Sequence, residues 1–175
     1  MTPAACDIFL VRHGETTWNV TRTMQGQVSV ESPLTERGEE QARVVAGPLQ
    51  EAGVAALYSS DLLRAVQTAE IISAVVKVTP DLSHGPLLRE RHVGVLQGLT
   101  MVEGRSRHPE AFQRLQQGEE FEGGGESDQS FEARVAEGCL PPLPRPPKHH
   151  HAFSSSTPAS PPPPPRGGFG GGGGG

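Results

Sequence analysis

Long apolar runs, cysteine pairs and a signal segment are all missing from this sequence. No apolar run approaches the roughly 20 residues that a membrane-spanning helix needs, so we expect no membrane partner. The first residues show neither a charged-then-apolar signal pattern nor an Arg- and Ser-rich transit stretch. The two cysteines, Cys6 and Cys139, cannot form a disulfide framework and lack the spacing of a zinc site. These absences favour a reducing compartment, and we expect a cytoplasmic protein.

Acidic and β-branched residues become scarce towards the end of the chain. From Leu140 onward there is no Asp, Glu, Val, Ile or Met, whereas 11 of the 17 prolines and 8 of the 22 glycines fall there. Such a composition buries too little apolar surface to offset the entropy of ordering it. We therefore predict one folded domain over residues 1–137 and a disordered Pro/Ser/Gly-rich tail over 138–175.

The charge of the remaining body is strongly acidic. Up to residue 139 the chain carries 12 Lys and Arg against 20 Asp and Glu, a formal charge of -8. A nucleic-acid-binding surface would need the opposite balance. We expect no nucleic-acid partner.

The first half of the chain alternates short apolar runs with longer periodic segments. We predict strands at 7–11, 54–59 and 75–78, and helices at 35–52 and from Ser60 onward. The strand at 7–11 (DIFLV) reads as buried and delivers Arg12, His13 and Gly14 to a sheet edge. The helix after the Ser60 cap places four apolar residues on one face: Leu62, Val66, Ala69 and Ile72. This alternation predicts an α/β fold with a mostly parallel sheet.

The second half predicts a loop followed by helices. Residues 87–99 mix charges with two glycines and read as a loop. Two further helices are predicted at 103–117, interrupted by Pro109, and at 127–137, with the acidic, Gly-rich turn 118–126 between them.

The triplet Arg12-His13-Gly14 suits a phosphate ester. An arginine binds phosphate oxygens in a bidentate fork, and a glycine lets the backbone approach. With an ordinary pKa of about 6.5, a histidine is substantially neutral at pH 7 and can act as a nucleophile. Alone, however, such a tripeptide is common.

The triplet becomes informative because it belongs to the first of three sequence blocks that follow one another in a set order. Leu10 to Asn19 (LVRHGETTWN) resembles the signature of the histidine phosphatase superfamily, also called the phosphoglycerate-mutase-like family. Residues 59–69 (SSDLLRAVQTA) and 88–99 (LRERHVGVLQGL) are similar to its second and third blocks. Lesser positions match at 25–27, 32–35 and 124–127. The resemblance implies a truncated three-layer sandwich with a mostly parallel sheet and helices on both faces.

The resemblance also implies roles for particular residues. His13 would accept the phosphoryl group and Glu90 would be the acid and base, although another carboxylate such as Glu15 is an alternative. The implied phosphate-binding residues are Arg12, Asn19, Gln25, Gly26 and Arg64. Phosphoryl transfer needs charge stabilisation and positioning more than a metal, so we expect no metal and no cofactor. The partner would be a small phosphorylated metabolite.

Within the family, the sequence favours hydrolysis over mutase chemistry. Phosphoglycerate mutases usually carry a tyrosine where Val93 stands, a lysine near Met101 and a paired arginine where residues 111–115 hold one arginine. Residues 91–94 (RHVG) and 123–127 (GGGES) resemble the plant metal-independent phosphoserine phosphatases. We predict a phosphatase of small phosphomonoesters, with phosphoserine and serine biosynthesis as the plausible setting and phosphoglycerate mutase as an alternative.

One departure from the family concerns activity. Members carry a second histidine at the end of a strand that follows the helix corresponding to 127–137. The histidines at 149–151 follow prolines and have no apolar strand to carry them into a site. We expect an open sheet edge, poor folding and little activity in this form. A non-catalytic phosphate-binding protein and an unproductive truncated product are the alternatives.

Overall fold

The computed structural model describes residues 7–29 and 31–139. The last helix continues through Cys139, so residues 138 and 139 belong to the folded part and not to the predicted tail. The prediction of disorder for 140–175 lies outside the described residues.

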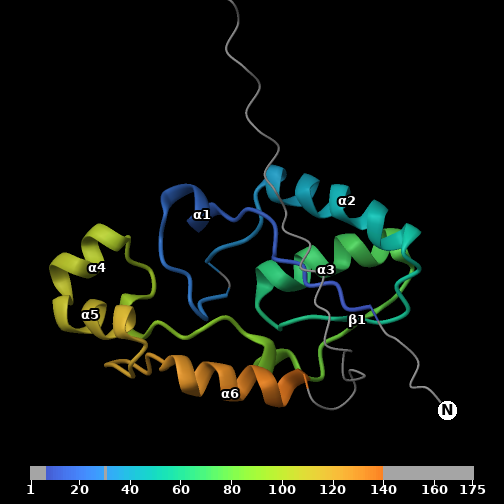
Figure 1. The fold of residues 1–175 in the computed structure, drawn as a ribbon. Helices are drawn as coiled ribbons and strands as arrows, with labels where there is room; N and C mark the ends of the chain where they lie inside the picture. Colours follow the sequence, from blue (N-terminus) through green and yellow to red (C-terminus); the bar gives the residue numbers. More distant parts are fainter. Residues whose placement is uncertain (1–6, 30, 140–175) are drawn as a thin grey trace, which may run out of the picture.

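A pair of packed helices forms one side of the molecule (Figure 1). Helix α2 (Glu36–Glu51) begins after Thr35, whose hydroxyl accepts a hydrogen bond from the Gly38 amide at 3.1 Å, and continues past Pro48. Helix α3 (Leu63–Val76) begins three residues after Ser60. Ala46 and Leu49 of α2 and Ile72 of α3 are buried together as one core cluster. Both helices confirm the predicted segments, but the cap predicted at Ser60 is wrong, because the N-cap of α3 is Leu62, whose amide donates to Ser60 Oγ at 3.3 Å.

The sheet is small and parallel. Strand β1 (Leu57–Tyr58) pairs with β2 (Pro80–Asp81), with Leu57 opposite Pro80. The strand predicted at 54–59 is confirmed at its centre. The strand predicted at 75–78 is wrong, because α3 continues to Val76 and ends on Lys77 in the left-handed conformation with φ 62°.

The predicted buried strand at 7–11 is also wrong. None of the other described residues hydrogen-bonds to the backbone of residues 8–12, and the side chain of Leu10 is 86 % exposed. A strand needs a hydrogen-bonded neighbour, and a cleft lies between this segment and β1. Residues 8–12 therefore belong to no sheet, whereas the amides of Gly14 and Glu15 donate to Thr68 and Gln41.

Helices and two short 3₁₀ turns complete the fold. The turns are η1 (Gly85–Leu88) and η2 (Gly94–Leu96), and the remaining helices are α1 (Thr17–Thr21), α4 (Met101–Arg107), α5 (Pro109–Gln117) and α6 (Asp128–Cys139). His108 separates α4 from α5, which confirms the break predicted at Pro109. A second core cluster joins the α5 region to η2 and contains Leu96, Ala111, Phe112 and Phe121.

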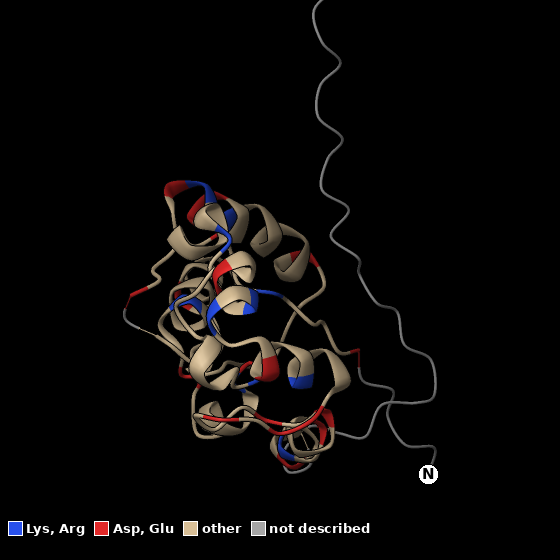
Figure 2. Ribbon diagram, turned by 90° about the vertical axis from the view of Figure 1, so that its left-hand side faces the viewer, with Lys and Arg blue, Asp and Glu red and all other residues tan. Residues whose placement is uncertain are grey.

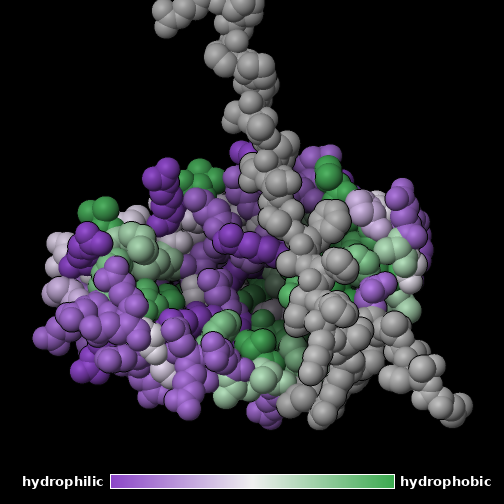
Figure 3. Space-filling model, in the orientation of Figure 1, coloured by the Kyte–Doolittle hydropathy of each residue, from purple (hydrophilic) through white to green (hydrophobic). Residues whose placement is uncertain are grey.

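The whole is an α/β fold that is mostly helical, with helices on either side of a small parallel sheet. Figure 1 places α2 and α3 at the top, α6 at the bottom and α4 beside α5 at the left. Acidic and basic residues are interspersed along the helices (Figure 2). In the face of Figure 3, polar residues cover the left side and apolar residues gather near the centre. Among the described residues, no helix combines the length and the apolar character that crossing a bilayer requires.

Candidate active site

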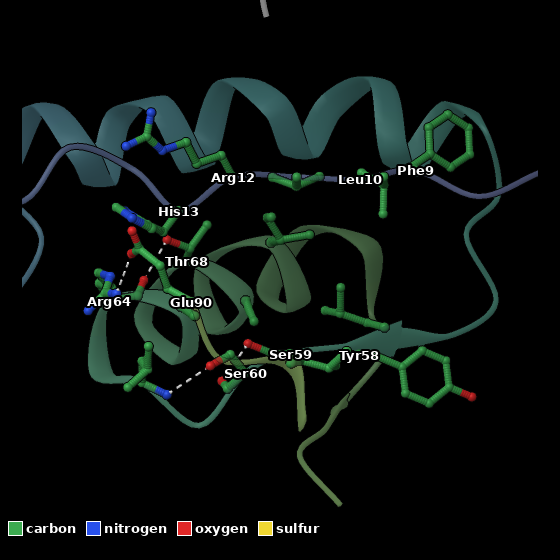
Figure 4. Close-up of a pocket in the computed structure, with 17 residues that line it drawn as sticks. Phe9, Leu10, Arg12, His13, Tyr58, Ser59, Ser60, Arg64, Thr68 and Glu90 are labelled. Atoms are coloured by element: carbon green, nitrogen blue, oxygen red, sulfur yellow. Dashed lines mark hydrogen bonds and ion pairs between the residues drawn. The ribbon is translucent and has the colours of Figure 1, made fainter. Parts of the chain in front are cut away.

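A cleft of about 470 Å³ lies between residues 9–13 and β1 (Figure 4). Residues 57–60 form the opposite wall, and side chains of α3, including Ala65, Ala69 and Ile72, line it as well. The charged groups gather at one end, where Arg12, His13, Arg64 and Glu90 lie near one another. Most of the cleft is apolar, and this end is its polar terminus.

His13 is oriented by the backbone next to it. Its Nδ1 lies 2.7 Å from the carbonyl oxygen of Gly14. A carbonyl oxygen only accepts, so Nδ1 carries the proton and Nε2 of the neutral ring keeps its lone pair. Burial is the main cause that lowers the pKa of His13, and the guanidinium groups of Arg64 and Arg12 lower it further, against the raising effects of the Gly14 carbonyl and Glu90. The ring is therefore neutral near pH 7, as a nucleophile requires.

Helix packing fixes the position of the His13 loop. The Gly14 amide donates to Thr68 Oγ1 at 3.1 Å, and that hydroxyl donates to the Arg64 carbonyl at 2.7 Å. On its other side Gly14 lies against α2, because a Cβ at Gly14 would come within 2.2 Å of the Gly38 carbonyl oxygen. In this structure the glycine lets the loop approach a helix.

Arg64 is a buried cation at the end of the cleft. Its side chain is 1 % exposed, and it donates to the carbonyl oxygens of Val28 at 2.9 Å and Gly26 at 2.7 Å. Nη2 also forms an ion pair with Glu90 Oε2 at 2.8 Å. These contacts hold the guanidinium beside His13.

Glu90 approaches the same end from the loop after η1. Its side chain is 51 % exposed although its carboxylate contacts Arg64. Its carbonyl oxygen accepts a hydrogen bond from Gln27 Nε2 at 3.1 Å. Arg12 completes the set, and it donates no hydrogen bond to another described residue. Two guanidinium groups, one neutral imidazole and one carboxyl group thus surround one space.

Three of the predicted phosphate-binding residues do not line the cleft. Asn19 Oδ1 accepts from the amide and the hydroxyl of Thr16, each at 3.0 Å, and closes the capping box of α1. Gln25 is 6 % exposed, and its Oε1 accepts from Thr16 and Ser32. Gly26 reaches the site only through its carbonyl, which holds Arg64. Their predicted role in binding phosphate stays a prediction.

The structure adds residues that the sequence did not single out. Thr68, Ser59 and Ser60 line the cleft. Thr68 lies one helical turn after Arg64, so its place on the same face of α3 could have been found from the spacing alone.

His92 has a structural role. Its Nδ1 accepts from the Gly94 amide at 3.0 Å, and its Nε2 lies 3.3 Å from Gln97 Nε2. Among the described residues, His13 is the only histidine that lines the cleft. The histidines at 149–151 lie outside the described residues.

Comparison with known proteins gives the family. The sequence pattern of the histidine phosphatase superfamily (branch 1) matches residues 8–150. The chain belongs to this superfamily. The match extends beyond residue 137, where the sequence predicts that the folded domain ends. The position of the domain boundary stays a prediction.

Curated relatives of this histidine phosphatase include two plant proteins. The Arabidopsis thaliana protein named metal-independent phosphoserine phosphatase is 47 % identical over 125 residues, which cover 69 % of this chain and 51 % of that protein. Phosphoglycerate mutase-like protein 4 of Arabidopsis thaliana is 42 % identical over 125 residues, covering 69 % of this chain and 53 % of that protein. The chain thus spans about half the length of the curated relatives it matches.

Solved structures share the fold. Bacillus stearothermophilus YhfR superposes with a TM-score of 0.64 at 36 % identity, covering 72 % of this chain and 61 % of that one. The mycobacterial glucosyl-3-phosphoglycerate phosphatase Rv2419c gives a TM-score of 0.60 at 35 % identity, covering 71 % and 59 %. The α/β fold class predicted from the sequence is confirmed.

Proposed function

We propose that this histidine phosphatase hydrolyses small phosphomonoesters through a phosphohistidine formed on His13. The observation that carries the proposal is the His13 ring, whose Nδ1 is engaged by the Gly14 carbonyl while Nε2 is left as the nucleophilic atom. Two guanidinium groups line the same end of the cleft and offer charge to the phosphoryl oxygens. Phosphatase names among the relatives agree with this chemistry.

The first step transfers the phosphoryl group to the protein. His13 Nε2 attacks phosphorus, the bond from phosphorus to the ester oxygen breaks, and the departing oxygen takes a proton from Glu90. The substrate dianion replaces Glu90 on Arg64, which leaves the Glu90 carboxyl group beside the departing oxygen. Arg12 and Arg64 neutralise the charge on the non-reacting oxygens.

The second step returns the protein to its resting state. Water attacks the phosphohistidine, the Glu90 carboxylate takes one of its protons, and the bond from nitrogen to phosphorus breaks. Inorganic phosphate leaves, and His13 is neutral again with its proton on Nδ1.

We infer that the substrate is an alkyl phosphate of a small metabolite, with phosphoserine as the first candidate and serine biosynthesis as the setting. Val93 stands where mutases usually carry a tyrosine, and the relative named phosphoserine phosphatase shares 47 % identity. Phosphoglycerate mutase activity is the alternative, supported by the second plant relative's name. Comparing release of phosphate from phosphoserine with isomerisation of a phosphoglycerate separates the two.

Replacement of His13 tests the mechanism. His13→Ala should abolish turnover and also abolish the acid-labile, base-stable phosphoprotein that forms when the chain is quenched during reaction with a ³²P-labelled ester. His84→Gln is the matched control, because His84 does not line the cleft. A label that persists in His13→Ala would contradict the assignment.

A non-catalytic phosphate-binding protein is the second candidate. The observation in its favour is that, in the part of the chain the structure describes, the cleft holds one histidine. It predicts that inorganic phosphate raises the melting temperature while no ester is hydrolysed. Normal turnover with a cooperative unfolding transition would contradict both this candidate and the expectation of an unproductive truncated product.

A further inference from the structure

The backbone of Glu90 has no regular structure of its own. Residues 89–93 lie between η1 and η2 and belong to no helix or strand. A carboxyl group that transfers a proton has to sit within hydrogen-bond reach of the leaving oxygen. Neighbouring side chains therefore have to fix this segment, and the inference rests on the proposed role of Glu90.

Arg134 of α6 supplies one set of these contacts. Its Nη1 donates to the carbonyl oxygens of Leu87 and Arg89, each at 2.9 Å, and to that of Pro86 at 3.4 Å. Its Nη2 donates to the carbonyl oxygen of Glu90 at 3.3 Å. One planar guanidinium thus binds the main chain of four residues that end at Glu90.

Glu126 holds the other side of the segment. Its two oxygens accept from Arg134 Nε and Nη2, each at 2.7 Å, in a bidentate pair. Glu126 Oε2 also accepts from the His92 amide at 2.7 Å. The Arg134 guanidinium is the main cause that lowers the pKa of Glu126, so the pair stays charged at neutral pH.

Both members of the pair are shielded from solvent, and both lie outside the cleft. Each side chain is 18 % exposed, and the Arg134 guanidinium lies 5.4 Å from the centre of the Phe131 ring. Neither residue lines the cleft. Any effect on catalysis has to act through the segment they bind.

We propose that Arg134 and Glu126 form a clamp that positions Glu90 for proton transfer. The clamp holds the main chain before and after Glu90, while Arg64 holds its carboxylate from the cleft side. Gln27 Nε2 also donates to the Glu90 carbonyl oxygen at 3.1 Å, but the Glu90 side chain itself is 51 % exposed. Without the clamp, the main chain on either side of Glu90 loses its contacts with Arg134 and Glu126, and the carboxyl group moves towards solvent and away from the leaving oxygen.

Two esters that differ in leaving group separate positioning from general stability. Phosphoserine needs a proton on its departing alkoxide, whereas 2,4-dinitrophenyl phosphate releases a stable phenolate. A general acid contributes about 10² to 10⁴ in rate, and we expect Glu90→Gln to lower kcat on phosphoserine within that range. Arg134→Gln and Glu126→Gln should lower it at least about tenfold, and Arg134→Lys less. On the dinitrophenyl ester the three clamp variants should leave the burst of phenolate, which precedes the water attack that also uses Glu90, within about threefold of the parent.

Control and double variants complete the test. Arg114 of α5 donates to the Glu120 carbonyl oxygen at 3.4 Å and does not contact the segment around Glu90, so Arg114→Gln should change neither rate. Combining Arg134→Gln with Glu90→Gln should cost no more than Glu90→Gln alone, because both act on one proton transfer. Equal losses on the two esters, or additive losses in the double variant, would overturn the clamp.

Failure of the proposed function is distinguishable from failure of the clamp. If the parent hydrolyses neither ester, the phosphatase proposal fails, and the clamp is tested by titrating the His13 ring by NMR. The Glu90 charge raises the pKa of His13, so Glu90→Gln lowers that pKa. Arg134→Gln should lower it in the same direction, and the double variant no further than Glu90→Gln. A His13 titration that Arg134→Gln leaves unchanged would overturn the proposal.

Discussion

His13 couples the stability of the fold to pH. Burial is the largest cause that lowers its pKa below the ordinary value of 6.5, so the unfolded chain binds a proton at higher pH than the folded chain does. Stability is then fully present above pH 6.5 and falls as the pH drops through the folded-state pKa. Because His13→Gln removes the titrating ring, we expect the free energy of unfolding of this variant to fall less than that of the parent below pH 6.5. Urea unfolding of both proteins between pH 8 and pH 5 measures this difference. If the two free energies of unfolding fell in parallel below pH 6.5, the expectation would be refuted.

Gly14 has no room for a side chain. A Cβ there would lie 2.2 Å from the oxygen and 2.7 Å from the carbon of the Gly38 carbonyl, and backbone atoms cannot move aside as a flexible side chain can. Gly14→Ala should destabilise the fold by about 1–3 kcal/mol, the usual cost of overpacking.

Chemical denaturation measures this loss of stability, and a glycine of α2 serves as the control. A Cβ at Gly47 would meet nothing within 4 Å, so Gly47→Ala should change the free energy of unfolding by no more than about 1 kcal/mol. Similar losses at the two positions would show that close approach at Gly14 is not the cause.

Among the elements, α3 links Arg64 to the loop that carries His13. Thr68 lies one turn after Arg64 and accepts the Gly14 amide, so a single helix sets the spacing between Arg64 and His13. Thr68→Val keeps the shape of the side chain but leaves the Gly14 amide without its acceptor. The expected loss is about 1–3 kcal/mol in stability together with lower activity.

The control for this change is a threonine outside the site. Thr21 is exposed at the end of α1, and Thr21→Val should stay within about 0.5 kcal/mol of the parent. If thermal or urea unfolding gave Thr68→Val the same small effect, the amide contact would carry no stability.

Local sequence signals predicted the helices well and the strands poorly. The helix predicted at 35–52 matches α2, which begins after the Thr35 cap, and Pro109 located the break between α4 and α5, since caps and prolines act on their own turn. Residues 7–11 have the composition of a strand, but pairing depends on a neighbour distant in sequence, and the described structure offers none. Arg134 lies 44 residues from Glu90, and no short motif relates the two.

The same limit applies to the site. Arg12, His13, Arg64 and Glu90, which lie in three separate sequence blocks, all line one cleft. Asn19 and Gln25 instead accept hydrogen bonds from Thr16, whose amide donates to Asn19 Oδ1 and whose hydroxyl donates to Gln25 Oε1. A sequence pattern names the residues that recur at a site but does not say which of them touch the ligand.

At the scale of the whole molecule, residues 8–12 form an open edge beside the cleft. Phe9, Leu10 and Val11 are 43 %, 86 % and 40 % exposed, and no other described residue bonds to the backbone of this stretch. Exposed apolar strand-like segments with unpaired backbone groups promote pairing between chains. We therefore expect the purified protein to self-associate as its concentration rises.

Leu10→Lys tests whether this edge is the cause. A charge on an edge segment opposes pairing between copies, so sedimentation velocity should show less association at equal concentration. Because the Leu10 side chain is 86 % exposed, the free energy of unfolding should stay within about 0.5 kcal/mol. Val44→Lys is the matched control, since Val44 is 67 % exposed on α2, where the helix already satisfies the backbone. If both changes reduced association equally, net charge rather than the open backbone edge would be responsible.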